Sequence, residues 1–174
     1  MMLTYREATI KDVALIRSLA DGVWQATYAD ILSPEQIDYM FEMMYSVENI
    51  LIQMQERNHH YLIIMNDNTP CAYISIEPLG GGRYNFQKIY ARREIHGCGV
   101  GRYMIECGIE WVCMYESRQS LSVDGHIVIE LFVNRRNPAV GFYRHMGFDI
   151  VSTRDHAIGN DFYMNDYIME RVLR

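Results

Sequence analysis

The chain has 174 residues, of which 49% are hydrophobic and 22% charged, and 16 basic and 22 acidic side chains give a formal net charge of −6. This length and balance indicate one folded domain with a sizeable core, spanning residues 1–174. The acidic balance argues against a general nucleic-acid binder, which would carry a basic face. No signal peptide is evident and no apolar run approaches the roughly 18 residues that span a membrane, so we expect a cytoplasmic protein without a membrane partner.

The four cysteines, at positions 71, 98, 107 and 113, form no CxxC pair and no cluster with histidines. Their spacing predicts no zinc site and no other metal cofactor. His59 and His60 are adjacent, and neighbouring side chains of a strand point to opposite faces, so these two do not indicate a metal site either.

The first third of the chain predicts one strand followed by two or three helices. Thr9 and Asp12 resemble a capping box, and Ser33 followed by Pro34 is a second helix start. Apolar residues recur at helical spacing after each start. The expected elements are a strand over 3–8 and helices over 13–27, 34–44 and about 47–57.

Strands dominate the remaining sequence, interrupted by two helices. Turn signals at 66–68 and 80–82 separate β-prone runs over 61–65, 72–76 and 84–91. A helical pattern covers 100–115, and the run 127–133 is apolar on both faces, which is typical of a central strand. Asn137-Pro138 opens a short helix that Gly147 closes, and strands over 148–153 and 162–172 follow. This order predicts a mixed α/β sheet flanked by helices.

Three glycines, Gly97, Gly99 and Gly101, alternate where a predicted strand gives way to a helix. Without Cβ atoms they leave the backbone N–H groups open to a ligand, and the helix start adds unpaired donors and a partial positive charge. Together these features predict a site for a phosphate or pyrophosphate. The stretch has neither the Lys-Ser/Thr of a nucleotide P-loop nor the spacing of a dinucleotide fingerprint.

A second motif, N-P-A-V-G-F-Y-R-H-M-G-F over residues 137–148, follows the central strand. With both motifs, the chain resembles the GNAT N-acetyltransferase superfamily over about 84–153. The family's coenzyme motif, Arg/Gln-x-x-Gly-x-Gly/Ala, matches residues 96–101 except that His96 replaces Arg or Gln. The next family motif, Asn-x-x-Ala-x-x-x-Tyr-x-x-x-Gly-Phe, is nearly complete, although its alanine falls one position early, at Ala139.

The resemblance implies a single GNAT-like α/β domain, with a mixed central sheet of about six to seven strands and about four to five flanking helices. It also implies acetyl-CoA as cosubstrate and direct attack by a primary amine. Backbone N–H groups of the glycine loop would hold the pyrophosphate, and the preceding strand would pair with the pantetheine arm. The implied coenzyme residues are Ile89, Tyr90, Ala91, His96, Gly97, Cys98, Gly99, Val100, Gly101, Arg102, Asn137 and Tyr143.

Tyr143 is the candidate general acid, because a phenol can donate a proton to the departing thiolate. A core aromatic is the alternative role for this residue. Many relatives place a Glu base on the strand before the glycine loop, where this chain has Asn85. Glu77 is our substitute candidate for the base, and an ordinary hairpin carboxylate or a water chain to solvent are the alternatives. We expect Cys98 to be a bystander, because the chemistry of the loop comes from its backbone.

In this family, the first two helices and their connection line the acceptor site. Here the resemblance implies Trp24, Tyr28, Asp30 and Glu35 as substrate-binding residues, in a region that resembles polyamine-acetylating members. A helix core with a dimer patch is the alternative, and a homodimer is common in the family. The leading function is therefore acetylation of a small amine such as a polyamine. The alternatives are a protein N-terminal or lysine acetyltransferase and a non-catalytic acyl-CoA sensor.

Overall fold

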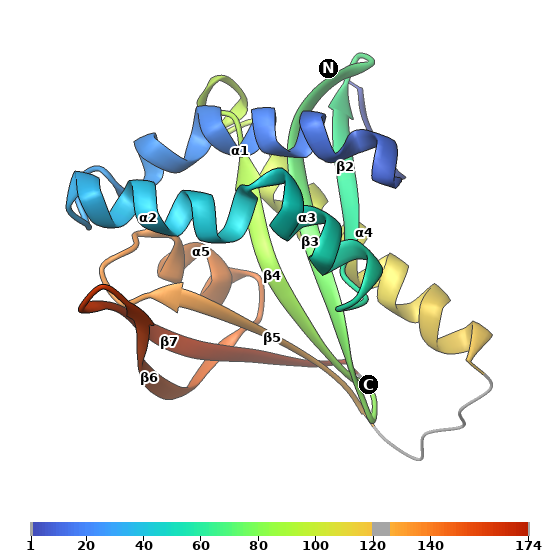
Figure 1. Cartoon of the computed structure of the whole chain (residues 1–174). Helices are drawn as coiled ribbons and strands as arrows, with labels where there is room; N and C mark the ends of the chain where they lie inside the picture. Colours follow the sequence, from blue (N-terminus) through green and yellow to red (C-terminus); the bar gives the residue numbers. More distant parts are fainter. Residues whose placement is uncertain (1, 120–125, 174) are drawn as a thin grey trace.

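A mixed β-sheet crosses the molecule and carries helices on both faces (Figure 1). The computed structural model describes residues 2–119 and 126–173, and within these ranges it has seven strands and five α-helices. The strands are β1 (Leu3–Glu7), β2 (His60–Asn66), β3 (Thr69–Gly80), β4 (Arg83–Ala91), β5 (Ile127–Asn134), β6 (Asp149–Gly159) and β7 (Phe162–Leu173). The helices are α1 (Val13–Tyr28), α2 (Pro34–Tyr45), α3 (Val47–Gln55), α4 (Val100–Arg118) and α5 (Ala139–His145).

The strand order is β1-β2-β3-β4-β5-β7-β6. Neighbouring strands are antiparallel except β4 and β5, which run parallel because α4 crosses between them. The predicted α/β class, mixed sheet and numbers of elements are confirmed. The predicted domain of residues 1–174 includes residues 1, 120–125 and 174, which lie outside the described ranges.

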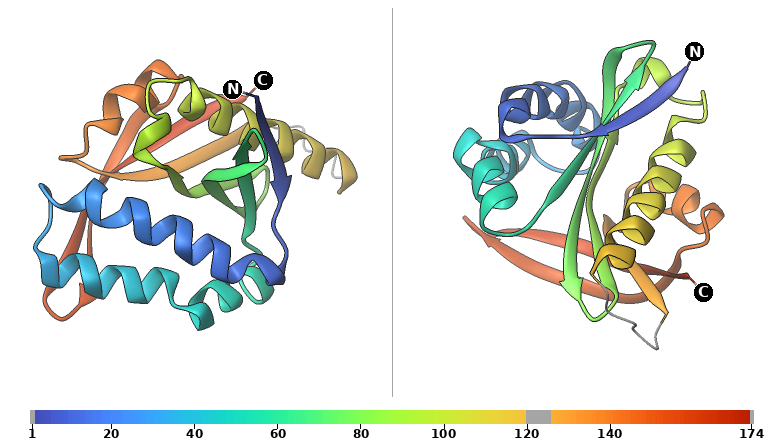
Figure 2. Two further views of the ribbon diagram at one scale, coloured as in Figure 1. Left: turned by 90° about the horizontal axis from the view of Figure 1, so that it is seen from above. Right: turned by 90° about the vertical axis from the view of Figure 1, so that its right-hand side faces the viewer.

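Two apolar cores lie on opposite faces of the sheet, one beneath α1, α2 and α3 and the other beneath α4 and α5 (Figure 2). Alternation along β3 divides its side chains between them, because successive side chains of a strand point to opposite faces. Ile74 and Ile76 belong to the core under α4, whereas Tyr73 belongs to the core under α1.

β4 and β5 pair over a short stretch and then separate into a V (Figure 1). The pairs join residues 83–85 of β4 to 128–130 of β5. A bulge at Gln87 follows, since Phe86 pairs with Ile76 of β3 and Lys88 pairs with Ser75. Beyond this point β4 remains bonded to β3 and β5 to β7, so the facing edge of β4 has no strand partner in the described chain.

The predicted helix starts are confirmed. The Thr9 side chain accepts from the Lys11 N–H, and Asp12 Oδ2 accepts from the Thr9 N–H at 2.8 Å. Ser33 Oγ accepts from the Gln36 N–H at 3.2 Å, ahead of α2. These side chains satisfy backbone donors that no intrahelical carbonyl can reach.

The hairpin of β6 and β7 is longer than predicted. β6 extends to Gly159, whereas the sequence predicted a strand that ends at Thr153. β6 is the edge strand and most of its residues are exposed, so its sequence lacks the apolar alternation that marks a half-buried strand. Asn160 and Asp161 turn the chain with φ angles of 50° and 57°.

No helix in the described part of the chain is long and apolar enough to cross a membrane. Among the same residues, no group of three or more His, Cys, Asp or Glu side chains could hold a metal ion.

Candidate active site

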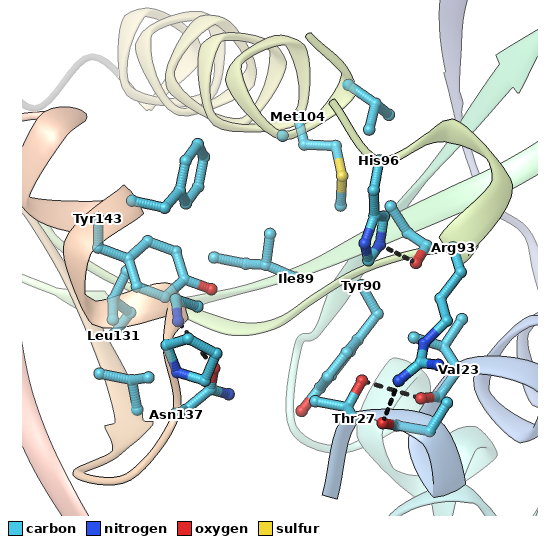
Figure 3. A pocket seen from close by; sticks show the side chains of 18 of the residues that line it. Val23, Thr27, Ile89, Tyr90, Arg93, His96, Met104, Leu131, Asn137 and Tyr143 are labelled. Atoms are coloured by element: carbon cyan, nitrogen blue, oxygen red, sulfur yellow. Dashed lines mark hydrogen bonds between the residues drawn. The ribbon is translucent and has the colours of Figure 1, made fainter. Parts of the chain in front are cut away.

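A cavity of about 790 Å³ occupies the V between β4 and β5 (Figure 3), and we call it the strand cavity. Its walls come from β4 and β5, from the loop before α4, from the first turns of α4 and α5, and from the end of α1. The predicted coenzyme residues that line it are Ile89, Tyr90, Ala91, His96, Gly97, Gly99, Val100, Gly101, Arg102, Asn137 and Tyr143. Cys98 is exposed and is not among the described lining residues.

The glycine loop has the left-handed backbone that its sequence suggests. Gly97 and Gly99 have φ angles of 78° and 83°, and Gly99 is the N-cap of α4. A residue with a Cβ rarely adopts this conformation, and glycine adopts it without strain. The N-terminus of α4, with its unpaired N–H donors, thus opens on the strand cavity, as an anion site requires.

Two further glycines allow close packing around this site. A Cβ on Gly101 would lie 3.0 Å from Cζ of Phe142 in α5, and one on Gly108 would lie 2.7 Å from Cζ of Phe86 in β4. Real Cβ atoms do not come as close as the second distance without displacing a neighbour. The small residues therefore fix the depth at which α4 rests on the sheet and beside α5.

His96 lines the strand cavity and is also bonded to the end of β4. Its Nε2 donates to the carbonyl oxygen of Ala91 at 2.9 Å, which ties the loop to the end of β4. Arg93, another residue of the cavity lining, donates to the carbonyl of Ala26 at 2.9 Å and ties the loop to α1. Both side chains thus hold the loop against its neighbours (Figure 3).

Asn137 stands where β5 leads into α5. Its Oδ1 accepts from the N–H of Ala139, the first residue of α5, at 2.9 Å, although the N-cap residue itself is Pro138. An amide that accepts through oxygen keeps two N–H donors for another partner. Because Asn137 lines the strand cavity, those donors are within reach of a ligand there.

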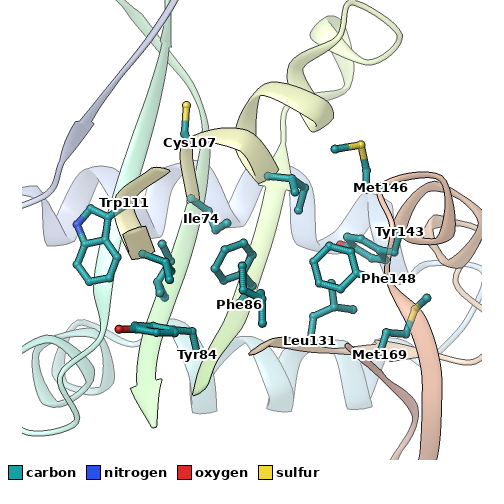
Figure 4. Packing of buried hydrophobic residues seen from close by; sticks show 14 of the residues in the cluster. Ile74, Tyr84, Phe86, Cys107, Trp111, Leu131, Tyr143, Met146, Phe148 and Met169 are labelled. Atoms are coloured by element: carbon teal, nitrogen blue, oxygen red, sulfur yellow. The ribbon is translucent and has the colours of Figure 1, made fainter. Parts of the chain in front are cut away.

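Tyr143 combines a buried ring with a hydroxyl that faces the cavity. The residue is 8% exposed and belongs to the apolar core under α4 (Figure 4). Its hydroxyl points into the strand cavity toward Ile89 of β4 (Figure 3). Burial, with a smaller effect from Tyr28, raises the pKa of Tyr143, so the phenol is protonated at neutral pH. Both roles considered from the sequence, core aromatic and proton donor, are therefore compatible with one position.

A second cavity of about 480 Å³ lies on the other side of β4, bounded by α1, α2 and the β6–β7 hairpin. We call it the hairpin cavity. Tyr28, Gln87, Tyr90 and Phe132 line both cavities, so the two meet at these side chains. Methionines and aromatics make up much of its wall, including Trp24, Met40, Met43, Met44 and Tyr163.

Tyr28 and Tyr90 form the boundary between the cavities. Their hydroxyl oxygens are 2.9 Å apart, and Trp24 packs on Tyr28 with ring centroids 4.4 Å apart. Burial raises the pKa of Tyr28 to about 12 and the pKa of Tyr90 well above its ordinary value. Both phenols are therefore neutral at physiological pH, and a neutral hydrogen bond links them where the two cavities meet.

The hairpin is bonded directly to α2. Tyr39 Oη donates to the carbonyl of Ile158 at 2.8 Å, and Gln36 Nε2 donates to the carbonyl of Tyr163 at 2.8 Å. Gly159 allows the approach, because its φ is +97° and a Cβ there would lie 2.6 Å from Tyr39 Oη. These contacts close the side of the hairpin cavity that lies between α2 and the hairpin.

The remaining predicted site residues are dispersed. Asp30 lines the strand cavity, and Arg136 holds its backbone by donating to its carbonyl at 3.1 Å. Glu35 is exposed on the first turn of α2 and lines neither cavity in the described structure. Glu77 also lies outside both cavities; its carboxylate accepts from Gln87 Nε2 at 2.8 Å and is 3.6 Å from His59 Nε2. Burial lowers the pKa of His59 to about 3, so this histidine is neutral beside Glu77.

Sequence reasoning assigned no role to four charged residues of the hairpin cavity, which are Arg57, Lys88, Arg154 and Asp166. Lys88 carries a signal in the sequence, because it is a lysine within an otherwise uncharged β-prone run, 84–91, but that signal does not indicate a role. Arg154 and Asp166 carry no such signal, because they lie 12 residues apart on two strands and meet only through the hairpin register.

Comparison with known proteins identifies the family. A family model described as the acetyltransferase (GNAT) domain matches residues 57–150, more than half of the chain. The chain belongs to the GNAT acetyltransferase family. The predictions of this family, of the GNAT fold and of an N-acetyltransferase enzyme are thereby confirmed. Acetyl-CoA is the cosubstrate of the family and therefore of this protein.

Other GNAT proteins resemble the chain over almost its entire length. The spermidine N(1)-acetyltransferase of Thermoplasma acidophilum is 24% identical over 170 residues, which cover 94% of this chain and 96% of that protein. The crystal structure of the PaiA N-acetyltransferase from the same organism, in complex with coenzyme A, has a TM-score of 0.77 at 21% identity and covers 99% of both chains.

The ribosomal-protein-S18-alanine N-acetyltransferase of Escherichia coli has a TM-score of 0.70 at 16% identity, covering 99% of this chain and 94% of that one. Proteins named for a polyamine and for a protein substrate thus both resemble this chain over most of its length, so the resemblance by itself does not identify the acceptor.

Proposed function

We propose that this protein transfers the acetyl group of acetyl-CoA to the primary amine of a small molecule by direct attack. The observation that carries the proposal is the meeting of two cavities at Tyr28 and Tyr90, one bordered by the glycine loop and one by methionines and aromatics. In the proposal, the strand cavity receives the coenzyme and the hairpin cavity receives the amine. The thioester then lies at their junction.

The strand cavity offers the groups that a coenzyme A arm needs. Backbone N–H groups from Gly97 to Arg102 would bind the pyrophosphate at the start of α4. The open edge of β4, at Ile89–Ala91, would pair with the pantetheine amides as a strand would, and Asn137 would add its free amide donors. This binding depends largely on main-chain groups.

In the reaction, the amine nitrogen bonds to the thioester carbon and the carbon–sulfur bond breaks. A backbone N–H of β4 would stabilise the oxyanion that forms in between. Tyr143 would donate its proton to the departing sulfur, because its raised pKa leaves it protonated and its hydroxyl faces the cavity. A general acid of this kind contributes ~10²–10⁴-fold to the rate.

Glu77 remains our proposed acceptor of the amine's proton. Glu77 does not line the hairpin cavity in the described structure, but its carboxylate accepts a hydrogen bond from Gln87, which lines that cavity. The proton of the amine would therefore reach Glu77 through water molecules. Glu77→Gln keeps the hydrogen-bonding shape and removes the base, and we expect kcat to fall at least about tenfold. An unchanged kcat would leave the water chain to solvent as the route.

The bonded contact between α2 and the hairpin favours a small acceptor over a protein chain. The spermidine N(1)-acetyltransferase relative makes polyamines the first class to assay. The test is release of the coenzyme thiol with a panel of polyamines, amino acids, simple alkylamines and peptide N-termini. Turnover of small amines is expected. Turnover of peptides only would make the protein a protein acetyltransferase, and coenzyme binding without thiol release from any amine would make it a sensor.

A further inference from the structure

The hairpin cavity is richer in positive than in negative charge. Arg57, Lys88 and Arg154 line it, and Asp166 is the one carboxylate among its described lining residues. Arg154 donates to Asp166 Oδ2 at 3.3 Å and its guanidinium carbon lies 3.9 Å from the centre of the Phe132 ring. These two side chains neutralise each other, so the excess positive charge comes from Arg57 and from Lys88 when its amine is protonated.

Lys88 is a buried amine that forms no ion pair within the described chain. It is 5% exposed, and its Nζ donates to Gln53 Oε1 at 2.8 Å. The rings of Tyr45 and Tyr61 lie 5.9 and 5.7 Å from the nitrogen. An ammonium has three N–H donors, so this environment satisfies one of them with an oxygen and leaves the others for a further partner.

The charged groups around Lys88 do not compensate it. Glu77 favours its charged form, but that carboxylate is bonded to Gln87 and does not reach Lys88 as an ion pair in the described structure. Arg57 opposes the charge, because it is a second cation at the same cavity. Burial lowers the pKa of Lys88 to about 7, so a bound anion would both complete its contacts and favour its protonation.

We infer that the acceptor is an amino carboxylate: its amine meets the thioester at Tyr28 and Tyr90, and its carboxylate binds Lys88 and Arg57. This inference rests on the proposed function and narrows its acceptor class. Lys88 and Tyr90 lie on the same face of β4, two residues and therefore roughly 7 Å apart, which suits a short carbon chain between the two groups. A polyamine would instead bring several positive charges beside Lys88 and Arg57.

The test compares three acceptors with the same five-carbon chain: 5-aminopentanoate, 1,5-diaminopentane and pentylamine. The kcat/KM for thiol release is measured with the whole protein and acetyl-CoA. We expect 5-aminopentanoate to exceed 1,5-diaminopentane by about tenfold or more, which is the effect of one hydrogen-bonded charge pair. Equal or better turnover of the diamine would overturn the inference and leave the proposed function intact. Failure of all three, together with the wider panel above, would overturn the proposed function itself.

Two variants assign the preference to its residues. Lys88→Met retains the length of the side chain without its charge, and should lower kcat/KM for 5-aminopentanoate about tenfold while pentylamine stays within about twofold. Arg57→Gln changes an exposed residue that does not support the core, so it tests the same preference even if the buried variant folds poorly. Lys11→Met, at an exposed lysine outside both cavities, is the matched control. A preference that survives both Lys88→Met and Arg57→Gln would contradict the assignment.

Discussion

The strand cavity and the hairpin cavity are built in different ways. The strand cavity presents mostly main-chain groups: a glycine loop, the N-terminus of α4 and the open edge of β4. The hairpin cavity presents side chains from α1, α2, β4, β5 and the β6–β7 hairpin. A binding site made of backbone groups requires glycines at fixed spacing, so it can be predicted from the sequence. A binding site made of dispersed side chains can change its ligand by substitution while the fold stays the same.

The largest effect on turnover should come from Tyr143, in the strand cavity. Tyr143→Phe removes the hydroxyl that faces the strand cavity and keeps the ring that fills the core. We expect kcat to fall ~10²–10⁴-fold, the usual contribution of a general acid. Coenzyme A affinity, measured by calorimetric titration, should stay within about threefold, since little binding energy resides in one phenol. An unchanged kcat would refute the acid role.

A smaller effect, on the affinity for coenzyme A, should come from changing the backbone conformation of the glycine loop in the strand cavity. Gly99→Ala forces an L-residue into φ of 83°, at a cost of roughly 1–2 kcal/mol. We expect the dissociation constant of coenzyme A to rise about tenfold, because the loop must shift its N–H groups to relieve the strain. Gly22→Ala, in a helical stretch of α1 with open space around its Cβ, is the control and should leave affinity unchanged. Equal loss in both variants would argue against a specific role for the loop.

Burial of Lys88 in the wall of the hairpin cavity should make the free energy of unfolding depend on pH. The pKa of Lys88 is about 7 in the fold, against an ordinary value of 10.5, so between these values the unfolded chain binds a proton that the folded chain lacks. Stability therefore rises with pH across this window, by up to about 1.4 kcal/mol per unit, and is lost as the pH falls toward 7. Denaturant unfolding between pH 7.5 and 9.5 should show this rise in the wild type and a weaker one in Lys88→Met. Parallel curves would mean that Lys88 titrates normally.

The smallest effect is expected at Cys98, which is exposed and does not line the strand cavity in the described structure. Cys98→Ser should leave kcat and the coenzyme A dissociation constant within about twofold, because the main chain of the loop is kept. Loss of activity on alkylation of the wild type, but not of Cys98→Ser, would instead indicate a reactive thiol.

The contrast between backbone groups in the strand cavity and side chains in the hairpin cavity also determines how much of each could be predicted from the sequence. The spacing of Gly97, Gly99 and Gly101 and the Asn137–Phe148 motif were sufficient to predict the family and the residues around the strand cavity. Helix starts at Thr9 and Ser33 were also predictable, because capping is a local interaction.

The hairpin cavity was predictable only in part. Trp24 and Tyr28 of α1 were predicted among the acceptor residues and line it, but its charged side chains meet only through tertiary pairing. Lys88 and Asp166 reach it through the registers of β3 with β4 and of β6 with β7. His96 illustrates a different limit, because its bond to the Ala91 carbonyl depends on the path of the loop and has no signal in the sequence. Glu35 was expected among the acceptor residues from the resemblance to polyamine-acetylating members, but it lies exposed on the first turn of α2 and lines neither cavity in the described structure.

The most direct test of the division between the two cavities is a crystal structure of the protein with coenzyme A bound. The account predicts the pyrophosphate on the N–H groups of residues 97–102, the pantetheine arm along β4 at Ile89–Ala91, and the sulfur within hydrogen-bonding distance of the Tyr143 hydroxyl. A pyrophosphate bound away from the glycine loop, or a sulfur turned away from Tyr143, would contradict it.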